Sequence, residues 1–150
     1  MGNLRDKWQT LWRKPEPAPT IWRMRVERER SAIGKLNDRL EVTLLPTVPE
    51  QAVRAMQVAL DELLTNVVMH ARQAAGSIEL EIAHSRRALD VRISYIAAEF
   101  DPTRTPVTDV TTVAASPIGG LGIHLVRSLM DEFRYEYLDG LNVLHLRKKC

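Results

Sequence analysis

Hydrophobic and polar residues alternate in several parts of the chain, and each alternation predicts a strand. The first strand is expected in residues 20–27, where three apolar residues share one side: Trp22, Met24 and Val26. We interpret these three as core or dimer-interface residues rather than as part of a site. Two further strands are expected at residues 77–83 and 89–95, joined by a polar turn.

Between the first and second strands, apolar residues recur at helical spacing. Ser31 is placed to cap a helix whose apolar positions are Ile33, Leu36, Leu40 and Leu44. Pro46 ends this helix. Thr47 and Glu50, three residues apart, form a capping-box pattern that opens a second helix. Its apolar stripe consists of Val53, Met56, Leu60, Leu63, Val67 and Ala71.

The second half of the chain contains a long loop and a helix that glycines lead into. Residues 100–118 show no period, and loops of this length in a compact domain are usually lids or disordered. Residues 119–130 pass from glycines to helical spacing, and a hairpin of residues 133–137 and 141–146 follows. This order predicts an α+β fold, a two-layer sandwich whose mostly antiparallel mixed sheet is covered on one face by helices.

Residues 1–19 are expected to be an appendage to a single domain of residues 20–150. The spacing of four apolar residues predicts a short amphipathic helix: Leu4, Trp8, Leu11 and Trp12. Alternating prolines in residues 15–19 then indicate an extended linker. The two tryptophans either cover an apolar patch on their own domain or dock against a second subunit or partner, and the sequence leaves both open.

The composition limits the compartment and the kinds of partner that we expect for the protein. A chain of 150 residues with one cysteine, Cys150, forms one modest core and no intramolecular disulfide. No stretch is long and apolar enough to span a membrane and no secretory leader is seen, so we expect a cytoplasmic protein. A net charge of +2 is too small to indicate direct nucleic-acid binding, and the arginines within residues 23–30 are interpreted as a solvated strand face.

A line of polar residues follows the edge of the second helix. Glu62, Asn66 and His70 lie four residues apart and therefore share one side of the helix. A glutamate there can act as a general base, and an asparagine oxygen is a suitable ligand for magnesium. A solvated helix edge explains the same spacing.

A glycine-rich loop precedes the third helix. Gly119, Gly120 and Gly122 would let the main chain approach a phosphate, whose charge a helix N-terminus stabilises. No Lys-Ser/Thr follows, so this is not a Walker loop. A flexible hinge explains the glycines nearly as well.

Together the two segments resemble the RsbW/SpoIIAB-type anti-sigma-factor serine kinases, which have the GHKL or histidine-kinase-like ATPase fold. Residues 62–71 (Glu-Leu-Leu-Thr-Asn-Val-Val-Met-His-Ala) are similar to the N box of that family. Residues 119–132 are similar to its last glycine box and helix, and Phe100-Asp101-Pro102 to the start of its ATP lid. The resemblance runs from about residue 20 to residue 149.

The resemblance implies a role for individual residues. Glu62 would be the base that activates a serine hydroxyl, and Asn66 would hold the Mg²⁺ that bridges the phosphates of ATP. The phosphates would lie against the glycine box, residues Gly119, Gly120, Leu121, Gly122 and Ile123, with Arg104 near the terminal phosphate. The implied partners are a STAS-domain anti-sigma-factor antagonist, which is phosphorylated, and a sigma factor or sigma-like regulator; a homodimer is also implied.

One family motif is absent. Where the family has Asp-x-Gly before its Phe-Asp-Pro, this chain has Tyr95 and Ala97, so the carboxylate that would accept a hydrogen bond from adenine is missing. Two hypotheses follow. The protein is either an active ATP-dependent serine/threonine kinase with altered adenine recognition, or a degenerate kinase that sequesters its partner without nucleotide.

Overall fold

The computed structural model describes residues 18–104 and 120–150, and the sequence predicts the order of its elements correctly. The strands are β1 (Thr20–Val26), β2 (Ala75–His84), β3 (Ala88–Ile96), β4 (Glu132–Leu138) and β5 (Leu141–Lys149). The helices are α2 (Arg30–Leu44), α3 (Glu50–His70) and α4 (Gly120–Leu129), with a 3₁₀ turn, η1 (Pro102–Arg104). The predicted N-terminal helix and most of the predicted long loop lie outside the described residues.

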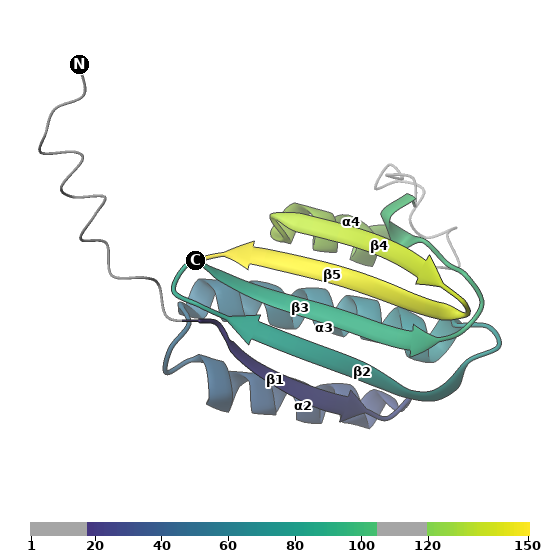
Figure 1. Cartoon of the computed structure of the whole chain (residues 1–150), viewed down its shortest axis with the longest axis horizontal. Helices are drawn as coiled ribbons and strands as arrows, with labels where there is room; N and C mark the ends of the chain where they lie inside the picture. Colours follow the sequence, from purple (N-terminus) through teal and green to yellow (C-terminus); the bar gives the residue numbers. More distant parts are fainter. Residues whose placement is uncertain (1–17, 105–119) are drawn as a thin grey trace, which may run out of the picture.

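The five strands form one sheet in the order β1-β2-β3-β5-β4, and every neighbouring pair is antiparallel. The hairpin between β4 and β5 turns at Asp139 and Gly140, both with positive φ (48° and 85°), as the sequence predicts. All three helices lie on one face of the sheet (Figure 1). The expected α+β two-layer sandwich is therefore confirmed.

The core lies between the helices and the sheet, and it consists of the predicted apolar stripes. Leu40 of α2 and Leu60 and Leu64 of α3 are fully buried, as are Ile82 and Ile93 on the facing strands. Burial of this kind is the main stabilising contribution to such a fold. It fixes the inner side of α3, and so the direction in which the polar edge of α3 points.

Both predicted helix caps are wrong. Helix α2 begins one residue before Ser31, after Glu29, and no side chain caps it. Helix α3 begins at Glu50 after Pro49, whose φ of −53° already suits a helix start, again without a side-chain cap. The Thr47 hydroxyl instead donates to the carbonyl of Leu44, 3.4 Å away, because it belongs to the turn that ends α2.

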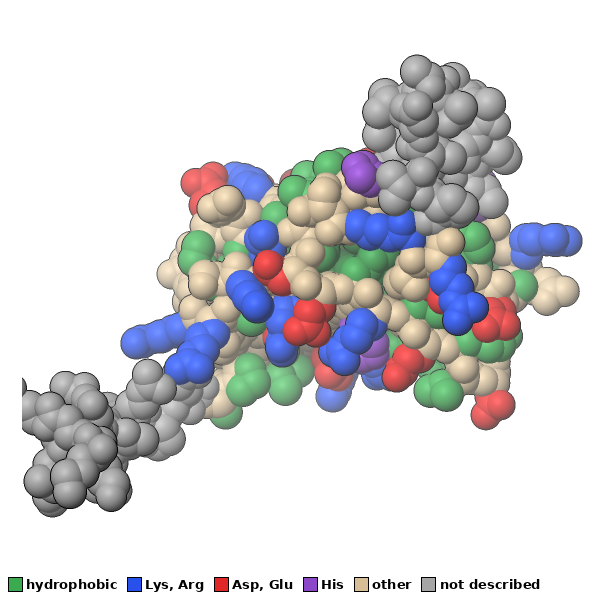
Figure 2. All heavy atoms as spheres, turned by 90° about the horizontal axis from the view of Figure 1, so that it is seen from above, with side chains coloured by type: hydrophobic (Ala, Val, Ile, Leu, Met, Phe, Trp, Pro, Cys, Tyr) green, Lys and Arg blue, Asp and Glu red, His purple; other side chains and the backbone are tan. Residues whose placement is uncertain are grey.

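The outer face of the sheet is charged and paired across strands. Arg23 lies 2.8 Å from Glu81, and Arg25 lies 2.9 Å from Glu79, which agrees with the interpretation of a solvated strand face. Seen from the side of β4 and α4, basic and acidic side chains are interspersed (Figure 2). Arg28 differs, since its guanidinium donates to the carbonyls of Ala75, Gly76 and Ile96.

None of the described helices is long and apolar enough to cross a membrane.

Candidate nucleotide site

A cavity of about 310 Å³ opens between the C-terminal half of α3, the end of β3 and the segment that follows β3. Leu63, Val67 and Leu144 form an apolar part of its wall, and Asn66 adds an amide. A mainly apolar cleft with a few polar groups is the usual form of a small-molecule site. The polar edge of α3 therefore faces a cavity at Asn66 rather than open solvent alone.

The amide nitrogen of Asn66 is sealed from solvent and has no hydrogen-bond partner among the described residues. An unpaired buried amide costs roughly 1–3 kcal/mol in proteins. A ligand in the cavity would relieve that cost. The same side chain carries an oxygen of the kind that Mg²⁺ prefers, so the residue fits the predicted metal-binding role.

Glu62 lies one helical turn before Asn66 and meets the glycine box. A Cβ built on Gly122 would overlap Oε2 of Glu62 and lie 3.1 Å from its Cδ. Only glycine therefore leaves room for this carboxylate against α4. The two segments that the sequence singles out are in contact, although the glycine accommodates a side chain of the protein rather than a phosphate.

The structure gives less direct information about the other residues of the glycine box. Gly119 lies outside the described residues, and Gly120 and Leu121 begin α4. Ile123 is fully buried, so only its main chain could meet a ligand. The N-terminus of a helix such as α4 favours negative charge.

Arg104 ends the η1 turn and its side chain is 88% exposed. Its Nε lies 3.3 Å from Oδ2 of Asp101. The other oxygen of Asp101 accepts hydrogen bonds from the amide and hydroxyl of Thr103, at 2.9 and 2.6 Å. Arg104 is not part of the cavity wall in this conformation, so its predicted contact with a terminal phosphate stays a prediction.

Tyr95 occupies the cavity wall at the position of the missing aspartate, and only 4% of it is exposed. Burial, with a smaller contribution from Tyr135, raises the pKa of Tyr95 to about 12, although the nearby Arg28 acts in the opposite direction. The phenol is therefore neutral at physiological pH. Ala97 is also buried, and its amide donates to the carbonyl of Gly140 at 3.2 Å.

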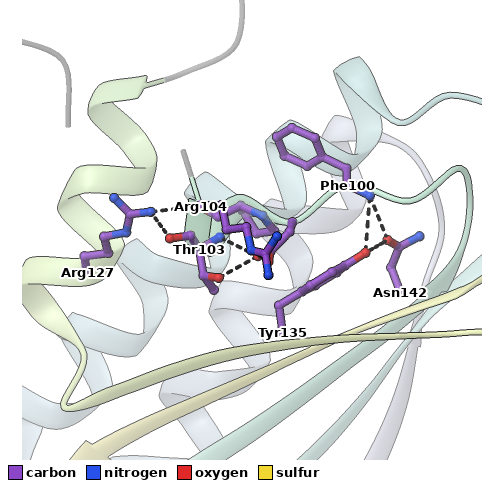
Figure 3. A network of polar contacts seen from close by, with 8 residues as sticks. Phe100, Thr103, Arg104, Arg127, Tyr135 and Asn142 are labelled. Carbon is purple, nitrogen blue, oxygen red and sulfur yellow. Dashed lines mark hydrogen bonds and ion pairs between the residues drawn. The ribbon is translucent and has the colours of Figure 1, made fainter. Parts of the chain in front are cut away.

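Several residues of the site were not predicted from the sequence. Arg72 and Glu99 contribute to the cavity wall, and both belong to irregular segments without a pattern. Arg127 of α4 donates to the carbonyls of Pro102 and Thr103 and so holds η1 against α4 (Figure 3). Asn142 could have been predicted, since it is a polar residue on the strand side that also carries the buried Leu144 and Leu146.

Comparison with known proteins identifies the fold family. The model of the histidine kinase-like ATPase domain matches residues 28–148. The chain belongs to this family. The matched residues include the cavity wall, Glu62, Asn66 and the described part of the glycine box.

Two relatives of this ATPase domain are protein kinases by name. The serine-protein kinase RsbW of Listeria monocytogenes is 32% identical over 101 residues, which cover 63% of this chain and 64% of that protein. The serine/threonine-protein kinase BtrW of Bordetella bronchiseptica is 34% identical over 90 residues, covering 57% of this chain and 63% of that protein. In both cases the chain spans less than two thirds of the relative's own length. The resemblance to RsbW-type proteins is thereby confirmed.

A solved structure shows the same fold. The RsbU and RsbW domains of Rv1364c from Mycobacterium tuberculosis match with a TM-score of 0.54 and 17% identity. The match covers 90% of this chain and 33% of that chain. The match shows a shared fold for the part of the chain that the structure describes.

Proposed function

We propose that this protein is an ATP-dependent serine protein kinase of the anti-sigma type. In this proposal it binds Mg²⁺-ATP in the cavity beside Asn66, phosphorylates a STAS-domain anti-sigma-factor antagonist and binds a sigma factor. The observation that carries the proposal is the shared helix edge of α3. It presents an unpaired buried amide to the cavity at Asn66 and, one turn earlier, a carboxylate in a slot that only Gly122 leaves open.

Asn66 and the phosphates would together hold the metal. Among the described residues, no group of three or more His, Cys, Asp or Glu is placed to hold a metal ion. Bound Mg²⁺ supplies charge neutralisation at the phosphates. The α4 N-terminus lies on the same side of the fold as Glu62 and favours anions, so it would orient the phosphate chain.

Glu62 would accept the proton of the substrate serine. Its carboxylate packs against Gly122 in the first turn of α4, one helical turn from Asn66. A positioned general base contributes about 10² to 10⁴ in rate. The packing against α4 limits the rotamers of Glu62 and so orients the base.

The alternative function is a degenerate kinase that sequesters its partner without nucleotide. Tyr95 favours it, because a buried neutral ring stands where the family has an acceptor for adenine. The loss of one such hydrogen bond weakens binding by roughly tenfold, about 1–3 kcal/mol for an unsatisfied group. This weakens nucleotide binding without abolishing it.

A phosphotransfer assay tests the proposal. The purified protein is mixed with a STAS-domain antagonist and γ-labelled ATP, and the label on the antagonist is measured. We expect serine labelling by the wild type and a loss of at least 100-fold in Glu62→Gln, which should still bind the antagonist. The matched control is Asp61→Asn, which neutralises the adjacent exposed carboxylate. Equal labelling by Glu62→Gln and Asp61→Asn would contradict the assigned base.

A further inference from the structure

Asn142 on β5 is the one polar or charged residue that is buried as a whole among the described residues, with no exposed surface. Its amide nitrogen donates to the carbonyls of Ala97 and Ala98, at 3.1 and 3.3 Å. Its oxygen accepts from the hydroxyl of Tyr135 at 2.6 Å and from the amide of Phe100 at 3.2 Å. Every donor and acceptor of the side chain is thus engaged.

The segment that Asn142 holds comes after the end of β3 and is not part of a strand or helix. Two main-chain bonds also fix it, from Ala98 to Arg72 (2.8 Å) and from Ala97 to Gly140 (3.2 Å). Ala98 and Phe100 contribute to the wall of the nucleotide cavity. The buried amide therefore determines the conformation of one side of that cavity.

The main-chain amide of Phe100 is held by two acceptors. Its amide lies 3.2 Å from both the Tyr135 hydroxyl and the Asn142 oxygen, and it is shared between them. The ring points away from these two acceptors (Figure 3), contributes to the cavity wall and remains 39% exposed. An exposed ring with a fixed main chain at a cavity is suited to stacking on a flat ligand.

We propose that Phe100 binds the base of the nucleotide by stacking, and that Asn142 and Tyr135 are the positioning residues that hold its main chain for this purpose. The proposal rests on the proposed function. Stacking does not need a carboxylate, because every base has a π-face. It explains how the cavity binds a base although Tyr95 offers only a neutral hydroxyl.

Calorimetric titration of the full chain with Mg²⁺-ATP tests this proposal. Phe100→Ala is expected to raise the Kd about 5- to 100-fold, the usual range for loss of one base-stacking ring. Tyr135→Phe removes one hydroxyl and leaves the Asn142 contacts with Ala97, Ala98 and Phe100, so it should fold and raise the Kd about 3- to 10-fold. Tyr137→Phe, two residues along the same strand and 37% exposed, is the matched control and should bind as the wild type.

A double variant separates positioning from a general loss of structure. If Tyr135 acts through Phe100, the variant carrying both Phe100→Ala and Tyr135→Phe binds no more weakly than Phe100→Ala alone. Independent, multiplying effects would overturn the positioning role, and an unchanged Kd in Phe100→Ala would overturn the stacking role. Failure of the wild type itself to bind would overturn the proposed function and, with it, this inference.

Hydrogen exchange gives a readout without nucleotide. The Phe100 amide should exchange faster in Tyr135→Phe than in the wild type, while amides in the centre of α3 keep their protection. Equal exchange of the Phe100 amide in the two proteins would overturn the role of Tyr135 in holding the Phe100 main chain. If Asn142→Ala folds, its Phe100 amide should exchange faster still. If it does not fold, the Tyr135→Phe variant alone provides the test.

Discussion

At the scale of single residues, the contact between Gly122 and Glu62 joins two sequence segments that lie far apart in the chain. Both segments are recognisable in the sequence, but their contact is not, because nothing in the spacing says that a glycine accommodates a glutamate. The contact gives that glycine a steric reason. A variant at Gly122 can therefore change phosphotransfer without changing the stability of the fold.

Gly122→Ala should impair phosphotransfer and leave the fold intact. The added methyl group displaces the carboxylate of Glu62, the flexible end of a side chain, so the strain is small, and alanine gains about 1 kcal/mol in a helix over glycine. We expect a change in the free energy of unfolding within about 1 kcal/mol and a loss of phosphotransfer of tenfold or more.

Gly34→Ala is the matched control for this change. Gly34 lies inside α2, and a Cβ there meets nothing within 4 Å. It should stabilise the protein by up to about 1 kcal/mol and keep full phosphotransfer. Parallel losses of activity in both variants would contradict the role of the Gly122 slot.

The buried phenol of Tyr95 should make the fold less stable at alkaline pH. Its pKa is raised from about 10 in the unfolded chain to about 12 in the fold, so the unfolded state ionises first as the pH rises. The stability contribution is fully present below pH 10 and lost between about pH 10 and 12. Tyr95 should account for a decrease of about 1.4 kcal/mol in the free energy of unfolding between pH 9 and 11.

Urea unfolding of the wild type and Tyr95→Phe at both pH values measures this decrease. Tyr135, whose pKa is also raised by burial, contributes in both proteins and so cancels in the comparison. The phenylalanine variant should show a weaker dependence on pH. The same dependence in both proteins would show that the Tyr95 phenol is not buried as described.

At the scale of elements, periodicity predicted which segments are helices and strands and which of their sides are buried. The apolar stripe of α3 illustrates this, since Val53, Met56, Leu60 and Leu63 are all buried. Capping was predicted wrongly because Ser31 and Thr47 have the right type but the wrong position. Arg72, Glu99 and Arg127 were not predicted as site residues, because irregular segments and tertiary contacts leave no period in a sequence.

The hydrogen bonds from Arg127 of α4 should stabilise the conformation of η1. Its guanidinium donates to two carbonyls of the turn, and hydrogen bonds from charged groups contribute about 1.5–3 kcal/mol. Arg127→Ala should therefore increase hydrogen exchange of the Arg104 amide, which donates to the carbonyl of Asp101. Arg134→Ala, an exposed arginine of β4, serves as the control. Unchanged exchange at Arg104 would contradict the anchoring role.

At the scale of the whole molecule, the fold class and the family were predictable, whereas the arrangement of the base end of the cavity was not. The sequence shows that an aspartate is missing at Tyr95. The position of the Phe100 main chain and the hydrogen bonds of Asn142 depend on contacts between β3, β4 and β5. The charged outer face of the sheet was predictable in kind from alternating arginines.

The exposed ion pairs of that outer face should contribute little to stability. Arg147 and Asp90 are close, at 2.6 Å, but their side chains are 44% and 38% exposed. The paired Arg23 and Arg25 side chains are 78% and 77% exposed. Such pairs contribute about 0–1 kcal/mol and are screened by salt. We expect urea unfolding in 0.05 and 0.5 M NaCl to differ by less than about 1 kcal/mol. A larger decrease in high salt would show that the outer face holds the sheet together.

Calorimetric titration with Mg²⁺-ATP is the most direct test of nucleotide binding beside Asn66. The wild type should bind at millimolar or lower concentration. Asn66→Ala should bind at least tenfold more weakly, because it removes the oxygen that we propose holds Mg²⁺. Asn37→Ala, which removes another amide with a buried unpaired atom, should bind as the wild type. Absence of binding by the wild type at millimolar Mg²⁺-ATP would contradict the kinase account and leave the partner-sequestering one.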